Sequence, residues 1–330
     1  MGQKMTLEAF LTEWNSEDDC VLVHTSGSTG KPKPMHIEKR RMLASARITC
    51  DFLGLKPGDV ALLCMPLDFI AGKMMVVRAL ERGMQLVSIP PDGHPLASVN
   101  RDIDFAAMVP MQVFNSLQIP AEREKLMRIK NLIIGGGAID HDLEKQLSDF
   151  PNAVWSTYGM TETLSHIALR RLSGPDASTW YTPFEQVNIS LNDDGCLMID
   201  APMVCESVLT TNDIAEIGAD GRSFRIIGRK DNVVCSGGIK IQIEEVERLL
   251  KPHLTVPFMI TKRKDEKFGE AIAMLYVPKE GGQPVNNVCR HVLPKYWQPR
   301  CFIAVGRLPM TQTGKPARRE AEIIAREWGL

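Results

Sequence analysis

The fold is decided by the stretch Cys20-Val-Leu-Val-His24, Thr25-Ser-Gly-Ser-Thr-Gly-Lys-Pro-Lys33, which a helical pattern follows at residues 38–52. The short apolar run predicts a buried strand. The pattern at 38–52 predicts a helix that Gly54 and Pro57 end. A strand, a glycine-rich loop and a helix in this order indicate an α/β domain.

The glycine-rich loop at residues 25–33 could hold a polyphosphate. Its backbone N–H groups and hydroxyl side chains can surround phosphate oxygens, while Lys31 and Lys33 supply positive charge. A Walker A loop is excluded, because Thr25 stands where that motif needs glycine and Pro32 where it needs serine or threonine. By itself, the loop leaves a flexible Gly/Ser linker open as the alternative.

Length and composition limit the class of protein. With 330 residues the chain has room for two domains, and its 44% hydrophobic and 24% charged residues are ordinary for a globular protein. A net charge of −1 gives no basic surface for nucleic acid or an anionic membrane. No run approaches the ~20 apolar residues that span a bilayer, and the first ten residues lack a secretory signal. The eight cysteines are scattered, without Cys-x-x-Cys pairs or metal-like spacing, so we expect reduced thiols and a cytoplasmic location.

The first two-thirds of the chain alternates strand-like and helical segments. Further strands are predicted at 60–65, 85–89, 105–109, 132–134 and 153–156, and helices at 74–82 and 140–150. Such alternation predicts an α/β fold with a mostly parallel sheet flanked by helices. From residue 187 a hairpin is predicted, with an Asn-Asp-Asp-Gly turn between its strands, and another strand at 224–227.

The segment after Arg229 has the pattern of a separate, small α+β domain. Helices are expected at 243–250, near 288–293 and at the C-terminus, and strands at 257–261, 271–277 and 301–305. We place the domain boundary at Lys230-Asp231-Asn232. This divides the chain into domains 1–229 and 230–330.

Four more loops combine glycine with charged or hydroxyl side chains: Tyr158-Gly-Met-Thr-Glu-Thr163, Gly228-Arg-Lys-Asp231, Ser236-Gly-Gly238 and Thr311-Gln-Thr-Gly-Lys315. The first could stack a base, contact a phosphate and hold Mg²⁺. A capped turn after a strand explains it equally well, and the last could be an exposed turn near the C-terminus.

Taken together, these loops resemble the ordered motifs of the adenylate-forming family, which contains acyl-CoA synthetases, peptide-synthetase adenylation domains and luciferases. The resemblance runs from about residue 21 to residue 319. It implies a large N-terminal domain that binds AMP and the acid, followed by a small mobile C-terminal domain. The implied activity uses ATP and Mg²⁺ to turn a carboxylic acid into an acyl-adenylate, whose acyl group then passes to coenzyme A.

The resemblance also implies roles for individual residues. The phosphate loop comprises Thr25, Ser26, Gly27, Ser28, Thr29, Gly30, Lys31 and Lys33. Gly135, Gly136 and Gly137 line the adenine pocket and Tyr158 stacks on adenine. Thr161 contacts the α-phosphate and Glu162 holds Mg²⁺. Asp213, assisted by Arg229, binds the ribose.

The implied mechanism has two half-reactions at one site. Lys315 bridges the carboxylate and the α-phosphate during adenylation, where Mg²⁺ and the ammonium group neutralise the growing charge. The small domain then rotates about the hinge at Asp231. This brings Ser236, Gly237 and Gly238 to the site, where glycine lets the thiol arm approach closely.

Within this family the chain is most similar to the o-succinylbenzoate–CoA ligase branch of menaquinone biosynthesis. The similarity lies in Met65-Pro-Leu-Asp-Phe-Ile-Ala-Gly72 and the following Met-Met-Val-Val-Arg78. Arg78, or less favourably Lys73, could pair with a second carboxylate on the acid. Alternatively, Arg78 lies on the solvated side of its helix.

Three departures from the family pattern stand out. Phe69 replaces a histidine in the wall of the acyl pocket, and Pro34 replaces a glycine after the phosphate loop. The phosphate loop begins only 24 residues from Met1, where family members carry a whole extra subdomain. A naturally short form or a homodimer that covers the exposed surface would explain this.

Two other functions stay open from the sequence. The chain could activate another aromatic or aliphatic acid, or load a carrier protein instead of coenzyme A. It could also be a catalytically silent nucleotide-binding protein.

Overall fold

The computed structural model describes residues 4–24, 34–139, 141–279, 281–282, 284–311 and 316–328. The chain divides into two compact units. Unit 1 comprises Met1–Ser190, Met198–Leu209 and Ile217–Arg225, and unit 2 comprises Leu191–Leu197, Thr210–Glu216 and Ile226–Leu330. The boundary expected at Lys230-Asp231-Asn232 stays a prediction.

A seven-stranded sheet forms the centre of unit 1, and its order is β4-β3-β5-β6-β7-β8-β9. The strands are β3 (Val60–Leu63), β4 (Gln85–Ser88), β5 (Phe105–Met108), β6 (Asn131–Ile134), β7 (Ala153–Gly159), β8 (His166–Arg171) and β9 (Thr182–Pro183). The strands from β4 to β7 pair in parallel, whereas β8 is antiparallel to β7 and β9 to β8. The predicted mostly parallel sheet is therefore confirmed.

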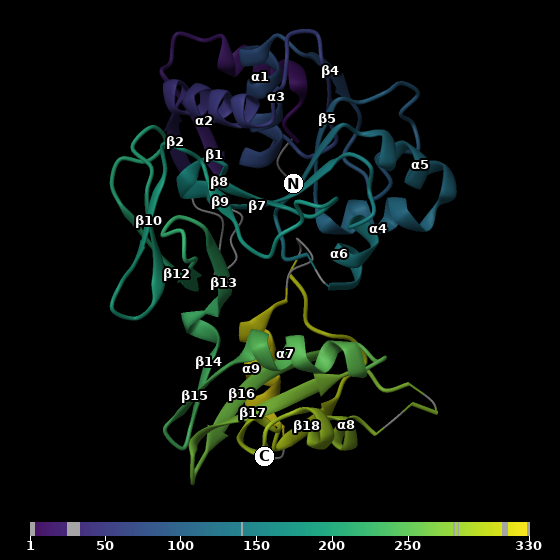
Figure 1. The fold of residues 1–330 in the computed structure, drawn as a ribbon, viewed down its shortest axis with the longest axis vertical. Helices are drawn as coiled ribbons and strands as arrows, with labels where there is room; N and C mark the ends of the chain where they lie inside the picture. Colours follow the sequence, from purple (N-terminus) through teal and green to yellow (C-terminus); the bar gives the residue numbers. More distant parts are fainter. Residues whose placement is uncertain are drawn as a thin grey trace. The chain divides into compact units, whose positions relative to one another are not determined.

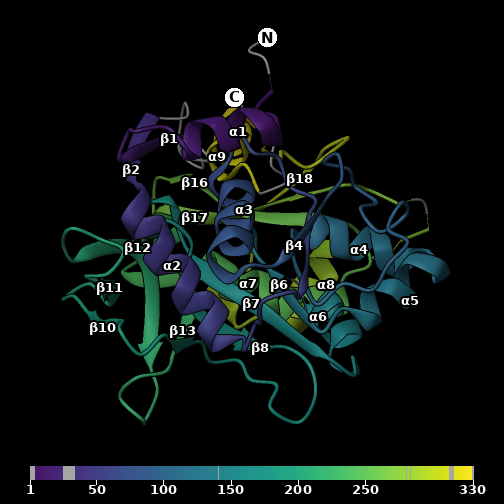
Figure 2. The same cartoon turned by 90° about the horizontal axis from the view of Figure 1, so that it is seen from above.

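Helices cover both faces of this sheet (Figure 1). They are α2 (Lys39–Phe52), α3 (Ile70–Arg82), α4 (Pro110–Gln118), α5 (Pro120–Arg128) and α6 (His141–Leu147). Alternate residues of β3, β5 and β6 pack against α4, α5 and α6 in one buried cluster. The helices α2 and α3 lie side by side on the other face (Figure 2). This two-sided cover explains why all four residues of β3 are buried and apolar.

The strand predicted at Cys20–His24 exists as β1, but it does not join the central sheet. It forms an antiparallel pair with β2 (Pro34–Glu38), and Leu22 is 39% exposed. Residues 25–33 connect these two strands. The helix α1 (Leu7–Trp14) precedes β1, and the hydroxyl of its N-cap Thr6 accepts a hydrogen bond from the backbone N–H of Ala9.

A four-stranded sheet has the order β10 (Asn188–Leu191), β11 (Cys196–Asp200), β12 (Leu209–Ile217) and β13 (Phe224–Arg229). The predicted neighbours β10 and β11 are confirmed. Their turn contains Gly195 at φ +76°, a backbone conformation that glycine adopts without strain.

The rest of unit 2 is the predicted α+β arrangement. Its sheet has the order β15-β14-β17-β16, with β18 parallel to β17. The elements are β14 (Val233–Ser236), β15 (Ile239–Gln242), β16 (Phe258–Asp265), β17 (Gly269–Tyr276), β18 (Cys301–Ala304), α7 (Ile243–Leu250), α8 (Val285–Val292) and α9 (Arg318–Glu327). One face of the sheet packs on α7 and α8, and the other on α9.

Three helices, α3, α6 and α8, have a boundary three or more residues from the prediction, and α8 begins at Val285 rather than near 288. α3 begins at Ile70 rather than 74, because Gly72 lets the first turn pack directly on the Pro66 carbonyl: a Cβ at Gly72 would lie 2.3 Å from that oxygen. α6 ends at Leu147 rather than 150. Within the part of the chain that the structure describes, no helix is long and apolar enough to span a membrane.

Candidate functional site

Several predicted site residues lie at one edge of the central sheet. β3, β5, β6 and β7 are parallel, so their carboxyl ends share this edge. Gly135 follows β6, Tyr158 is the next-to-last residue of β7, and Phe69 precedes the helix that follows β3. In open α/β sheets, ligands bind outside the carboxyl ends of the strands. The topology thus brings the expected adenine residues and one expected acid residue to the edge where a ligand would bind.

The glycines after β6 allow a close backbone approach. Gly135 donates its backbone N–H to the carbonyl of Met108, and a Cβ on it would lie 2.4 Å from Oγ1 of Thr157. Gly136 has φ +79°. Any other residue at these two positions would clash or be strained. Without side chains at these two positions, the backbone can be approached closely by a planar base.

Tyr158 belongs to an aromatic cluster at the end of β7. Its ring lies 5.1 Å from that of Phe224, edge to face, and 5.7 Å from that of Tyr181. The Tyr181 hydroxyl is 2.8 Å from Oγ of Ser156. These contacts fix the ring plane of Tyr158 before any ligand binds.

The connection from β7 to β8 is unusually tight. Gly159 has no room for a side chain, because a Cβ there would lie 2.2 Å from the Ser165 carbonyl oxygen. A short 3₁₀ helix (Thr161–Thr163) follows, and the buried hydroxyl of Thr163 donates to backbone carbonyls and accepts the N–H of Met160. Leu164 has φ +64°, a strained value for a residue with a branched side chain. Because such a conformation persists only where the surrounding structure imposes it, the backbone of the connection from β7 to β8 is held in place by its neighbours.

Within this connection, Thr161 is buried and Glu162 is exposed. Among the described residues, no three His, Cys, Asp or Glu side chains gather into a metal-binding group. A single exposed carboxylate nevertheless fits Mg²⁺, which keeps several waters and takes its other ligands from substrate phosphates. Glu162 is therefore compatible with its expected role.

Arg78 is buried in the middle of α3, with only 2% of its surface exposed. This overturns the alternative that it lies on the solvated side of the helix. Burial lowers the pKa of its guanidinium to about 10. Its Nη2 donates to Oγ of Ser165 at 2.5 Å, while its buried Nε has no hydrogen-bond partner in the described structure. No described carboxylate forms an ion pair with this cation.

Three residues linked to Arg78 by hydrogen bonds, Ser165, His166 and Thr49, were missed from the sequence. The ring of His166 lies 3.2 Å from Oγ of Ser165 through Nδ1 and 3.1 Å from Oγ1 of Thr49 through Nε2. Burial, and then the charge of Arg78, lowers the pKa of His166 well below 6.5. No local pattern could have indicated this contact, because Thr49 is on α2 and is 117 residues away.

Lys73, the other cation of α3 considered for the acid, already has a partner. Its buried Nζ lies 3.1 Å from Oε2 of Glu13 and 5.0 Å from the centre of the Phe10 ring. Glu13 is a further residue that sequence reasoning missed. Phe69 is 38% exposed at the start of the helix. Arg78 is thus the cation of α3 without a counter-charge among the described residues.

In unit 2, Asp213 and Arg229 are in contact, as their expected shared role requires. Nη1 of Arg229 lies 3.1 Å from Oδ1 of Asp213. Nη2 of Arg229 also reaches Oδ2 of Asp231 at 3.5 Å, and Nδ2 of Asn212 reaches the same oxygen at 3.3 Å. The expected hinge residue therefore shares a hydrogen-bonding group with the expected ribose residue.

The Ser236-Gly-Gly238 segment forms the turn between β14 and β15. Gly237 and Gly238 have φ +57° and +84°, which a two-residue hairpin turn of this type requires. Glycine at these positions therefore has a structural reason, in addition to the expected approach of a thiol. Two other sets of expected residues, the phosphate loop at 25–33 and Lys315, lie outside the described residues.

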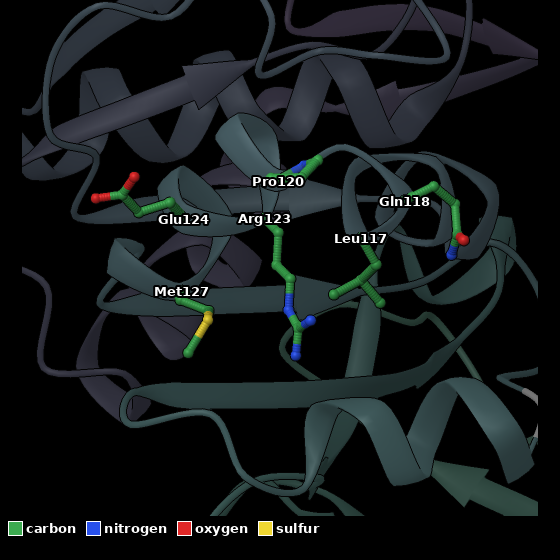
Figure 3. A pocket seen from close by; sticks show the side chains of 6 residues that line it. All are labelled: Leu117, Gln118, Pro120, Arg123, Glu124 and Met127. Carbon is green, nitrogen blue, oxygen red and sulfur yellow. The ribbon is translucent and has the colours of Figure 1, made fainter.

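A hollow of about 390 Å³ lies between α4 and α5, where Leu117 and Arg123 extend toward the same side (Figure 3). Its lining is Leu117, Gln118, Pro120, Arg123, Glu124 and Met127. None of these is a candidate site residue. We therefore place the candidate site at the carboxyl ends of the parallel strands, and not in this hollow.

Comparison with protein families identifies both parts of the chain. The AMP-binding enzyme family matches residues 4–197, and the AMP-binding enzyme C-terminal domain matches residues 259–315. The first match alone covers more than half of the 330 residues.

Individual relatives agree with these matches. A 2-succinylbenzoate–CoA ligase of Salmonella typhimurium is 29% identical over 315 residues, which cover 90% of this chain and 67% of that protein. The structure of an acyl-CoA synthetase (AMP-forming)/AMP-acid ligase II-like protein from Dyadobacter fermentans is 33% identical, with a TM-score of 0.65, and the match covers 94% of this chain and 91% of that one.

A further structure is similar in fold. The o-succinylbenzoate coenzyme A synthetase from Bacillus subtilis, solved with ATP and a magnesium ion, is 23% identical with a TM-score of 0.73. The match covers 91% of this chain and 69% of that one. The predicted acyl-CoA synthetase-like fold is confirmed.

Proposed function

The chain belongs to the AMP-binding enzyme family, and from this premise we propose that it is an AMP-forming acid–thiol ligase whose acid carries a second carboxylate. It uses ATP to convert the acid into an acyl-adenylate and passes the acyl group to coenzyme A. The proposed acid is o-succinylbenzoate, in keeping with the names of its relatives.

The observation that carries the choice of acid is the state of Arg78. A buried guanidinium without a counter-ion is costly in a folded protein. A second carboxylate would neutralise it and could accept from the Nε–H that has no partner in the described structure. A fatty acid or benzoate offers no such group.

The chain's own residues support adenylation as follows. Tyr158 and the glycines after β6 hold the adenine, Asp213 and Arg229 hold the ribose, and Thr161 contacts the α-phosphate. Glu162 binds Mg²⁺, which when bound withdraws charge from the phosphates. Lys315 bridges the carboxylate and the α-phosphate, and residues 25–33 enclose the β- and γ-phosphates.

The first experiment measures AMP release and thioester formation with coenzyme A and three acids: o-succinylbenzoate, benzoate and a medium-chain fatty acid. It is repeated with Arg78→Met, which keeps an unbranched apolar stem and removes the guanidinium and its charge. We expect kcat/KM for o-succinylbenzoate to fall about 10- to 100-fold, since a charged hydrogen bond contributes about 1.5–3 kcal/mol. The small activity with benzoate should hardly change.

Arg82→Met is the matched control, because Arg82 is on the same helix but binds Asp51 and the Leu55 carbonyl. It should leave the preference among acids unchanged. A loss in Arg78→Met that is equal for all three acids would contradict the role of Arg78. AMP release with acyl transfer only to a carrier protein would favour the carrier-loading alternative, and no pyrophosphate exchange with any acid would favour the silent protein.

We propose a cytoplasmic location and a homodimer as further properties of this ligase. All eight cysteines are free in the structure, and reduced thiols are normal in the cytoplasm. Light scattering of the purified protein would determine whether it is a dimer.

A further inference from the structure

A continuous line of hydrogen bonds leads from Arg78 into the protein. Arg78 on α3 contacts Ser165 before β8, Ser165 contacts His166 at the start of β8, and His166 contacts Thr49 on α2. The line ends where Oγ1 of Thr49 donates to the carbonyl of Ser45 at 3.1 Å. Arg78, Thr49 and His166 are all buried.

The direction of donation along this line follows from its two ends. A guanidinium can only donate, so Oγ of Ser165 accepts from Arg78. At the other end, Oγ1 of Thr49 gives its one proton to the Ser45 carbonyl, so it accepts from Nε2 of His166. Nδ1 of the neutral ring therefore carries no proton and accepts the proton of Ser165. The line fixes one tautomer of a neutral histidine.

This arrangement holds the cation without neutralising it. Lys73, five residues earlier on the same helix, is paired with the carboxylate of Glu13. Arg78 instead contacts a hydroxyl whose orientation is set by a neutral ring. The described part of Arg78's surroundings therefore fixes its position and keeps its full charge for another anion.

We infer that His166 is a positioning residue for acid recognition: through Ser165, and supported by Thr49, it holds the Arg78 guanidinium in place for the second carboxylate of the substrate. This inference rests on the proposed function. It adds a residue from β8 and one from α2 to the recognition of the acid, although neither need touch the substrate.

The test compares steady-state kinetics of the full chain with o-succinylbenzoate and benzoate as substrates, in four variants. His166→Phe keeps a ring of similar size and removes both nitrogens. We expect it to raise KM for o-succinylbenzoate about five- to tenfold, the effect of one lost hydrogen bond. The values of kcat, KM for ATP and KM for benzoate should stay the same.

The remaining variants separate positioning from general damage. His166→Asn keeps an acceptor close to the position of Nδ1 and should recover most of the loss. Thr49→Val removes the partner of Nε2 and should raise KM in the same selective way, by a smaller factor. His94→Phe is the matched control, because His94 pairs with Glu122 away from this line, and it should not alter KM.

Several results would overturn the inference. If His166→Phe raises KM equally for both acids, its role is only structural. If Arg78→Met selectively weakens o-succinylbenzoate while His166→Phe has no effect, the proposed function stands and the positioning role falls. If Arg78→Met is itself unselective, both fall. Should His166→Phe fail to fold, His166→Asn and Thr49→Val apply the same criterion.

Discussion

At the scale of single residues, His166 connects acid recognition with stability. Its pKa is well below 6.5 in the folded protein, because the ring is buried and lies near the charge of Arg78. In the unfolded chain the same ring titrates near 6.5. Below this pH the unfolded chain binds a proton that the folded protein resists, so this contribution to stability is present above pH 6.5 and is lost as the pH falls.

This predicts a difference between the wild type and His166→Phe. Between pH 6.5 and pH 5 the free energy of unfolding should fall in the wild type by up to about 1.4 kcal/mol per pH unit more than in the variant. Urea unfolding at several pH values measures it. Parallel pH dependences in the two proteins would show that His166 is not held neutral.

The sequence could predict some site residues but not the groups that hold them. Tyr158, Thr161 and Glu162 are adjacent in the chain and have a recognisable order. Thr49 and His166 meet only because α2 packs over the start of β8, which is a tertiary contact without a local signal. Whether Arg78 is buried also depended on packing, since a different rotation of the helix about its axis would have turned this side chain to solvent.

At the scale of elements, Glu13 joins three of them. From α1, its Oε1 accepts the backbone N–H of Leu22 on β1 at 3.0 Å, and its Oε2 pairs with Lys73 on α3. The strand that leads into residues 25–33 is thereby attached to the helix that carries Arg78. This single carboxylate ties the predicted phosphate region to the predicted acid region.

Glu13→Gln should destabilise the protein substantially. The amide can still accept from Leu22, but buried Lys73 loses its counter-charge, which typically costs about 3 kcal/mol. Chemical unfolding measures the change. Glu8→Gln on the exposed side of α1 is the matched control, and the double variant Glu13→Gln/Lys73→Met should recover much of the loss. A Glu13→Gln variant as stable as Glu8→Gln would contradict this account.

Helices and strands with a regular apolar pattern were predicted better than those in which apolar and polar residues are mixed without a period. α2 and α7 were expected within one residue of their observed bounds. α4 and α5 were not predicted, although each begins with proline at its first position, a common start signal. β2 was missed because Pro34-Met-His-Ile-Glu38 has a mixed composition, and only its pairing with β1 makes it a strand.

At the scale of the whole molecule, the two half-reactions can be separated by substitution. Lys315→Ala should abolish adenylate formation, measured by pyrophosphate exchange, and leave thioester formation from supplied acyl-adenylate largely intact. Asp231→Pro should do the reverse, with thioester formation reduced about tenfold or more, because proline fixes φ at the hinge and a domain motion becomes limiting.

Two controls accompany these variants. Lys295→Ala removes another lysine of unit 2 and should affect neither step. Asp231→Ala removes the contacts with Asn212 and Arg229 without fixing φ, so it should retain more thioester formation than Asp231→Pro. Equal loss of both steps in Lys315→Ala would contradict its role, and normal thioester formation in Asp231→Pro would argue against rotation.

The α/β and α+β parts of the chain could be predicted from the order of their strands and helices. The four-stranded sheet could not be assigned to one part, since residues 191–197 and 210–216 group with unit 2 while their neighbours group with unit 1. Sequence texture changes along the chain, whereas compact units form from tertiary contacts that no local pattern reports.

Gly159 also limits how this protein can diverge over evolutionary time. Any side chain at position 159 would clash with the backbone of Ser165 and His166. It could be accommodated only if the start of β8 changed at the same time. No single mutational step leads there, and lineages that descend from this sequence are confined to glycine at this position.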